Sequence, residues 1–162
     1  MRIAGMKFST ADGPGLRFVV LLQGCEHKCP GCYDPTAPQG GGVDFPFEEL
    51  VDQMLANPDT EGLTISGGEP FAQAEDCLTL IREARKAGFN IWCHTGASFE
   101  ILRDHGTAVQ KELLAEIDVL ADIPTGSAEE AASPLACGIS RDKRFVRVQE
   151  SLDRGSIVLW EA

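Results

Sequence analysis

Short apolar segments alternate with amphipathic segments along most of the chain. Four segments have the length and composition of buried strands, at residues 16–22, 62–66, 89–94 and 117–121. Between them, apolar residues recur at helical spacing over residues 47–55, 71–86, 99–103 and 108–116. Two further strands are expected at residues 145–148 and 157–160.

This alternation of strands and helices predicts an α/β fold with a mostly parallel sheet and right-handed crossovers. The chain offers too few strand–helix units for a closed eight-stranded barrel. We therefore expect a shortened, open partial (β/α) barrel. The chain has 162 residues, and its nearest approach to a linker is the Pro- and Gly-rich stretch 34–42, so residues 1–162 are expected to form a single domain.

Composition and charge exclude several classes of protein. The chain has 43% hydrophobic and 24% charged residues, which is ordinary for a globular protein and argues against a disordered or fibrous one. No apolar run approaches the length of a membrane span, and the N-terminus lacks the apolar core of a signal peptide, so we expect a cytoplasmic protein. The formal net charge of -11 disfavours nucleic acid and acidic membranes as partners.

Three cysteines, Cys25, Cys29 and Cys32, lie close together and directly follow the first buried strand. In α/β sheets, ligands gather at the carboxyl ends of strands, so this loop has the position of a binding site. Cysteine thiolates bind iron–sulfur clusters, and three of them would leave one iron open to an exogenous ligand. A structural zinc site that adds His27 is the alternative, although His27 is very close in sequence to Cys25.

A second motif, Gly67-Gly68-Glu69-Pro70, follows the next buried strand and is expected at the same edge of the sheet. Two glycines let a ligand approach the backbone closely, because no Cβ stands in the way. The Glu69 carboxylate can accept hydrogen bonds from an ammonium group, and Pro70 suits the first turn of a helix. Alone, the motif could be an ordinary Gly-rich turn; beside the cysteine loop, it favours a cofactor site.

Together the two motifs resemble those of the radical S-adenosylmethionine (SAM) superfamily. The resemblance implies that the three cysteines bind a [4Fe-4S] cluster and that the amine and carboxylate of SAM chelate its open iron. It also implies that Gly67, Gly68 and Glu69 hold the amine. No catalytic residue is implied beyond the cluster and SAM.

Further contacts with SAM follow from the same resemblance. Gly31 and Tyr33 flank the third ligand, so Gly31, Cys32 and Tyr33 are expected to touch SAM. Thr95, at the end of the third strand, could reach the ribose hydroxyls, or it could be a core or turn threonine. Arg17 faces the substrate or forms an ion pair; His94 receives no role.

The remaining cysteines fall outside these motifs. Cys77 lies on the apolar stripe of a helix, Cys93 in a strand and Cys137 in a late loop. Small buried thiols behave as hydrophobic residues, and we interpret all three in this way.

Within the superfamily, residues 12–25 resemble the glycyl-radical-enzyme activases, and residues 23–33 are especially similar to the activating protein of anaerobic (class III) ribonucleotide reductase. That resemblance implies reductive cleavage of SAM to a 5′-deoxyadenosyl radical, which takes a hydrogen atom from a glycine of the partner enzyme. A flavodoxin- or ferredoxin-like protein is the expected reductant. The loops at 34–42 and 122–140 are candidates for the docking surface or passive connectors.

The identity of the target has alternatives, because Asp34 and the residues that follow Asp122 depart from the pattern of the ribonucleotide reductase activase. Another glycyl radical enzyme, such as pyruvate formate-lyase, or a small molecule could be the substrate. A non-enzymatic module, stabilised by zinc or carrying electrons, is a third possibility. An electron carrier would normally ligate every iron with protein, so the three-cysteine motif argues against it.

Overall fold

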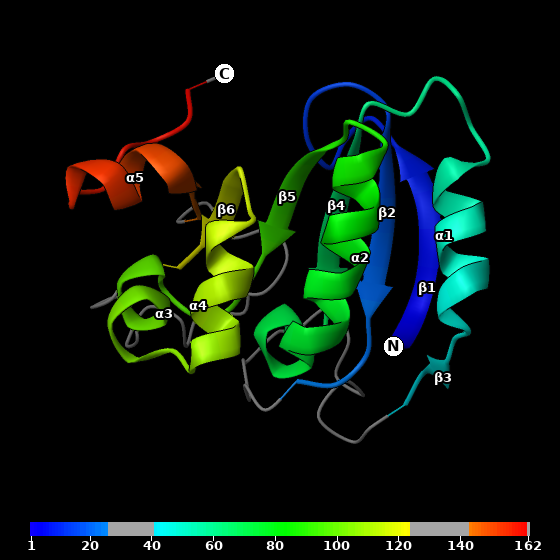
Figure 1. The fold of residues 1–162 in the computed structure, drawn as a ribbon, viewed down its shortest axis with the longest axis horizontal. Helices are drawn as coiled ribbons and strands as arrows, with labels where there is room; N and C mark the ends of the chain where they lie inside the picture. The colour runs from blue at the N-terminus through cyan, green and yellow to red at the C-terminus, as the bar shows by residue number, and fades with distance from the viewer. Residues whose placement is uncertain (26–40, 124–142, 162) are drawn as a thin grey trace.

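The computed structural model describes residues 1–25, 41–123 and 143–161 (Figure 1). In these residues one sheet has the strand order β3-β1-β2-β4-β5-β6-β7. Its strands are β1 Arg2–Ser9, β2 Arg17–Leu22, β3 Val43–Asp44, β4 Gly62–Gly67, β5 Asn90–His94, β6 Val119–Asp122 and β7 Arg144–Arg147. The helices are α1 Phe47–Leu55, the 3-10 helix η2 Pro70–Gln73, α2 Ala74–Lys86, α3 Phe99–His105, α4 Ala108–Ala115 and α5 Val148–Arg154.

The centre of the sheet is parallel. Strand β2 pairs with β4, β4 with β5 and β5 with β6, all in parallel register. Antiparallel strands complete both edges, with β1 and β3 beyond β2 and with β7 beyond β6. The expected open α/β sheet is therefore confirmed, and its parallel strands are the four apolar segments found in the sequence.

Helices cover one face of this sheet. In Figure 1, α1, α2 and α4 lie in front of the strands. Alternate strand residues point into the core beneath these helices, as expected for a pleated strand: Phe18, Val20, Leu22, Leu63, Ile65, Ile91 and Cys93. The intervening residues lie on the opposite face, which we call the open face: Arg17, Val19, Thr64, Trp92 and His94.

Three elements differ from the sequence expectations. Strand β1 has no regular alternation of buried and exposed residues and contains an irregularity between Ile3 and Gly5, so its pattern did not identify a strand. The strand expected at 145–148 ends at Arg147, and helix α5 begins at Val148. The strand expected at 157–160 is wrong, because this segment contributes only an isolated antiparallel bridge between Val146 and Leu159.

The single helix expected at residues 71–86 is divided into two elements. Pro70 begins a 3-10 turn, and the α-helix itself starts at Ala74. Ser98 caps helix α3, because its hydroxyl accepts a hydrogen bond from the N–H of Ile101. None of the helices in the described residues combines the length and apolar composition needed to cross a bilayer.

Candidate functional site

The first cysteine and the Gly-Gly-Glu motif meet at one edge of the sheet. Leu22, the last residue of β2, is in register with Gly67, the last residue of β4. Beyond these strand ends, the N–H of Glu69 donates a hydrogen bond of 2.8 Å to the carbonyl oxygen of Gly24. Cys25 follows and is half-buried. Strand pairing therefore brings together Cys25 and the Gly-Gly-Glu motif, which are far apart in the sequence.

The two glycines of the motif pack against the end of β2. Gly67 has a φ of +72°, and a Cβ built on it would lie 2.7 Å from the carbonyl oxygen of Leu22. A Cβ on Gly68 would lie 2.5 Å from the carbonyl oxygen of Gly24. Both contacts are with backbone atoms, which cannot rotate away. The close approach indicated by the sequence is thus made, in this structure, by the backbone of the chain itself.

In the described residues, the Glu69 carboxylate accepts hydrogen bonds from Phe71, Thr95 and Gly96. Glu69 is 6% exposed. Its Oε1 accepts from the N–H of Phe71 at 3.1 Å and from the hydroxyl of Thr95 at 2.8 Å, and its Oε2 accepts from the N–H of Gly96 at 2.9 Å. These donors come from the turn after β4 and the end of β5. They fix the orientation of the carboxylate at the edge where Cys25 lies.

Thr95 reaches the site through Glu69. Its hydroxyl donates to that carboxylate and accepts a hydrogen bond of 3.0 Å from the N–H of Ala97. The residue is buried, and its own N–H donates to the carbonyl oxygen of Ala121 in β6. This geometry is that of a turn threonine that positions a neighbouring carboxylate. The contact with the ribose hydroxyls stays a prediction.

Other expected site residues lie outside the described part of the chain. These are His27, Cys29, Gly31, Cys32 and Tyr33, together with Cys137 and most of the two loops considered for docking. In the described residues, no group of three His, Cys, Asp or Glu could hold a metal ion. Cys77 and Cys93 are buried in the core, as expected. Burial raises the pKa of both thiols, which makes them poor competitors for iron.

The donor set fits an iron–sulfur cluster. Cys25 stands at the carboxyl end of a buried parallel strand, where α/β proteins place their ligands. The motif adds two more thiols within the following seven residues, and thiolates are the ligands that such clusters require. Cys25, Cys29 and Cys32 would hold the cluster here.

Among the described residues, Arg17 forms hydrogen bonds with neutral groups and not the ion pair that was one of its expected roles. Its side chain is fully buried. In the described structure it donates only to neutral acceptors, including Thr64 Oγ1 at 2.6 Å and the carbonyl oxygen of Leu63 at 2.7 Å. Its guanidinium also lies over the Trp92 ring, 5.5 Å from the centroid. Burial lowers its pKa to about 10. Arg17 therefore organises the face of the sheet that carries Thr64 and Trp92, and its contact with a substrate stays a prediction.

The sequence did not predict the position of the turn at residues 12–15, to which Arg17 contributes a hydrogen bond. Arg17 Nη1 donates to the carbonyl oxygen of Pro14, and the Thr64 hydroxyl donates to that of Asp12 at 2.9 Å. The Asp12 carboxylate pairs with Lys7 at 2.9 Å. Burial opposes ionisation of Asp12, but hydrogen bonds from Ser9 and Lys7 leave its pKa lowered. The segment 12–15 is thereby fixed across the open face of β2 and β4.

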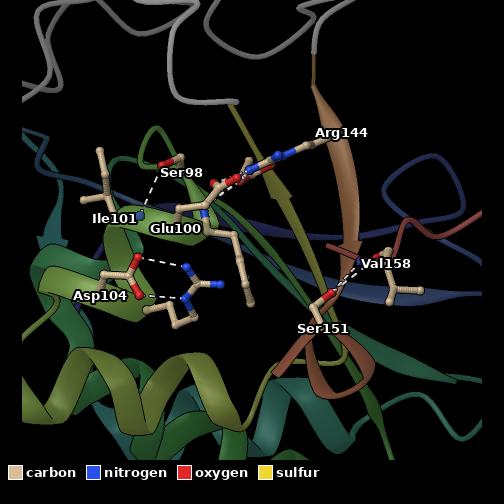
Figure 2. A network of polar contacts seen from close by, with 10 residues as sticks. Ser98, Glu100, Ile101, Asp104, Arg144, Ser151 and Val158 are labelled. Carbon is tan, nitrogen blue, oxygen red and sulfur yellow. Dashed lines mark hydrogen bonds and ion pairs between the residues drawn. The ribbon is translucent and has the colours of Figure 1, made fainter. Parts of the chain in front are cut away.

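A buried ion pair between β6 and β7 lies at the same edge of the sheet as Cys25 and Glu69. Asp122, at the end of β6, is fully buried and accepts two hydrogen bonds of 2.8 Å from Arg144 of β7. It also accepts one of 2.6 Å from the N–H of Phe99. Figure 2 shows Arg144 reaching from its strand toward Glu100 of α3, with which it forms a second ion pair. Sequence reasoning missed this network, because its members are far apart in the chain.

Comparison with known proteins places this site in a family. The model of the 4Fe-4S single cluster domain matches residues 11–145. The anaerobic ribonucleoside-triphosphate reductase-activating protein of Salmonella typhimurium is 33% identical over 121 residues, which cover 68% of this chain and 75% of the relative. The protein of the same name from Enterobacteria phage T4 is 31% identical over 118 residues, covering 68% and 72%.

A pyruvate formate-lyase-activating enzyme is also similar over a shorter region. The enzyme from Streptococcus mutans is 34% identical over 100 residues, which cover 56% of this chain and 37% of that enzyme. The family match includes the cysteine loop, the Gly-Gly-Glu motif and the strands that carry them. The chain therefore belongs to the 4Fe-4S single cluster domain family and is a radical SAM activating enzyme whose cofactors are a [4Fe-4S] cluster and SAM.

Proposed function

We propose that this protein generates the glycyl radical of an anaerobic ribonucleoside-triphosphate reductase. The observation that carries the proposal is the hydrogen bond between Glu69 and Gly24, which joins the Gly-Gly-Glu motif to the residue before Cys25. When bound, the cluster and SAM supply the one-electron chemistry that produces a radical able to take a hydrogen atom from glycine. The protein supplies binding, orientation and protection from water.

Each site residue has a stated task in this proposal. Cys25, Cys29 and Cys32 bind three irons, and the Gly-Gly-Glu motif holds the SAM amine. The Glu69 carboxylate is suited to this task because Thr95 and the N–H of Gly96 already fix it from β5. Gly31, Cys32 and Tyr33 touch SAM from the cluster loop. Hydrogen-atom abstraction needs no general base, so none is assigned.

The choice of partner rests on the extent of similarity. The activating proteins of anaerobic ribonucleoside-triphosphate reductase are matched over 75% and 72% of their length, whereas the pyruvate formate-lyase-activating enzyme is matched over 37%. The similarity to that second enzyme makes its glycyl radical target the second candidate. We further propose that residues 1–162 act as one radical SAM domain and that a flavodoxin- or ferredoxin-like protein supplies the electron.

The first experiment tests the cofactor chemistry alone. Anaerobically reconstituted protein is mixed with SAM and a strong reductant, and 5′-deoxyadenosine is quantified together with the iron content. We expect product that depends on both iron and SAM. Cys29→Ala should lose iron and product, whereas Cys77→Ala, which changes a thiol buried in the core, should keep both. Full iron in Cys29→Ala would refute the ligand assignment.

The second experiment tests the partner. The reduced protein is mixed with SAM and either a class III ribonucleotide reductase or a pyruvate formate-lyase from the same source, and the glycyl radical is measured by electron paramagnetic resonance. We expect the signal on the reductase. A signal on the lyase alone would transfer the proposal to the second candidate. SAM cleavage without a radical on either enzyme would leave the cofactor assignment intact and overturn both partners.

A further inference from the structure

Asp122 carries a carboxylate that is fully buried at the end of β6. Its Oδ1 accepts a hydrogen bond of 2.8 Å from Arg144 Nε, and its Oδ2 accepts from Arg144 Nη2 at 2.8 Å and from the N–H of Phe99 at 2.6 Å. A buried charge is costly unless it is paired and hydrogen-bonded, and two bonds from one guanidinium meet that requirement with a fixed geometry. Asp122 is therefore held at a defined position between β7 and the start of α3.

The segment that joins β5 to α3, residues 95–98, is attached to β6 on both sides. At its start, the N–H of Thr95 donates to the carbonyl oxygen of Ala121 at 3.0 Å. Just after its end, the N–H of Phe99 donates to the carboxylate of Asp122, the next residue of β6. Two consecutive residues of one strand thus hold this short segment in place.

The same segment supplies two of the hydrogen bonds to the Glu69 carboxylate. The Thr95 hydroxyl donates to Oε1 at 2.8 Å, and the N–H of Gly96 donates to Oε2 at 2.9 Å. A shift of the segment would move both donors together, because they belong to adjacent residues. The orientation of Glu69 therefore depends on how firmly β6 holds the segment.

Arg144 extends this hold to the first turn of α3. Besides its two bonds to Asp122, it forms an ion pair with Glu100 of that helix (Figure 2). Its side chain is 19% exposed, so solvent screens these charges less than it screens charges on the surface. One guanidinium thus joins β7 both to the carboxylate that holds Phe99 and to the helix that Phe99 begins.

We propose that Asp122 and Arg144 are positioning residues for SAM: their ion pair fixes residues 95–98, which in turn orient the Glu69 carboxylate for the SAM amine. Both residues act through that segment. The inference rests on the part of the proposed function that assigns Glu69 to the amine. It makes SAM affinity depend on a strand end that lies two strands away from β4 in the sheet.

The opposite end of β6 offers a matched control. Asp118, directly before β6, accepts a hydrogen bond of 2.6 Å from the N–H of Ile91 and pairs with Arg85 at 2.8 Å. These contacts repeat those of Asp122, but they lie where the parallel strands β5 and β6 begin, at the edge opposite to Glu69. Asp118→Asn and Asp122→Asn therefore make the same chemical change at the two ends of one strand.

The test compares these two variants with the wild type. Iron content after anaerobic reconstitution, SAM affinity by calorimetry and urea unfolding of the iron-free protein are measured. We expect lower stability and full iron in both variants, because each weakens an ion pair away from the cysteine loop. Only Asp122→Asn should bind SAM roughly tenfold more weakly. Wild-type SAM affinity in Asp122→Asn, or an equal loss of affinity in Asp118→Asn, would overturn the proposal.

A double-mutant cycle asks whether Asp122 acts through Glu69. Glu69→Ala should weaken SAM binding, and the addition of Asp122→Asn should then cause little further loss, because residues that act in one network are not additive. Losses that add fully would contradict the proposal. Unchanged SAM affinity in Glu69→Ala would instead refute the assignment of Glu69 in the proposed function, so the two failures are distinguished.

Arg144→Lys replaces Asp122→Asn if the latter does not fold or does not take up iron. Lysine keeps the charge beside Asp122 but cannot form the two parallel bonds of a guanidinium. We expect this variant to keep its iron and to bind SAM severalfold more weakly than the wild type. Wild-type affinity in Arg144→Lys would then overturn the proposal.

Discussion

The N–H of Glu69 donates to the carbonyl oxygen of Gly24 at 2.8 Å, and Cys25 is the next residue after that carbonyl group. The residue expected to hold the amine of SAM and the first ligand of the cluster are therefore joined by one backbone contact. Any change that separates the end of β2 from the end of β4 should weaken the binding of both the cluster and SAM. The first two predictions below concern this arrangement.

Gly68→Ala should separate the two strand ends. Its Cβ would lie 2.5 Å from the carbonyl oxygen of Gly24, and overpacking against backbone costs about 1–3 kcal/mol. We expect a lower unfolding temperature, less iron after reconstitution and weaker SAM binding. Gly5→Ala is the control, because a Cβ at Gly5 meets nothing within 4 Å. Wild-type iron and SAM affinity in Gly68→Ala would contradict the arrangement.

Thr95→Val should weaken SAM binding while the iron stays in place. The substitution keeps the shape of the side chain but removes the hydroxyl that donates to Glu69 at 2.8 Å. A hydrogen bond to a charged group contributes about 1.5–3 kcal/mol, so a loss of roughly tenfold or more in affinity is expected by calorimetry. Thr95→Ser should restore the affinity. Equal affinities for the valine and serine variants would argue against this role.

Arg17→Met should destabilise the fold. It removes five hydrogen bonds, and buried acceptors such as the carbonyl oxygen of Leu63 lose their donor. We expect a loss of about 3 kcal/mol in the free energy of unfolding, measured with urea on the iron-free protein. Arg82→Met, which breaks an exposed pair with Glu112, should cost less than about 1 kcal/mol. Similar losses for both variants would refute the organising role of Arg17.

His94 should make stability depend on pH. Burial, together with the charges of Lys143 and Arg17, lowers its pKa from 6.5 to about 4, and Asp12 opposes this shift. Because the unfolded chain binds this proton more readily, stability falls as the pH drops below about 6.5, and the loss is complete below the folded pKa.

The loss attributable to His94 should reach about 2 kcal/mol at pH 5. Urea unfolding of the iron-free protein between pH 7.5 and pH 5 measures it. In His94→Gln this part of the slope should disappear. The exposed histidine variant His105→Gln should keep the wild-type slope. An unchanged slope in His94→Gln would show that another group titrates.

The parallel centre of the sheet was predictable because its strands are buried on both faces. Val19 and Val20 are both fully buried, and Leu63, Thr64 and Ile65 likewise, so these segments read as continuous strand-like runs. Strand β1 carries no such signal, since only one of its residues, Ile3, is buried. Helix α5 begins directly after β7 without a side-chain cap, so nothing local marked its start.

The candidate site was predictable as motifs but not as contacts. Cys25 and Glu69 were identified because their residue types and spacing are informative on their own. The roles of Thr95, Arg17 and Asp122 depend on partners that are distant in sequence and are brought close only by strand pairing. A hydroxyl, a guanidinium or a carboxylate considered alone does not reveal whether its partner is a ligand, a backbone carbonyl or another side chain.

The order of strands in the sheet has a consequence for how the protein folds. From β1 through β2, β4, β5 and β6 to β7, each strand lies beside the one that precedes it in this series, and only the short β3 returns to the outer edge of β1. Only the pairing of β1 with β2 closes a short loop, because a helix or a longer segment separates the members of each parallel pair, and such non-local pairings form slowly. The β1–β2 hairpin is therefore the first part of the sheet able to form as the chain leaves the ribosome, with the first cysteine at its rim.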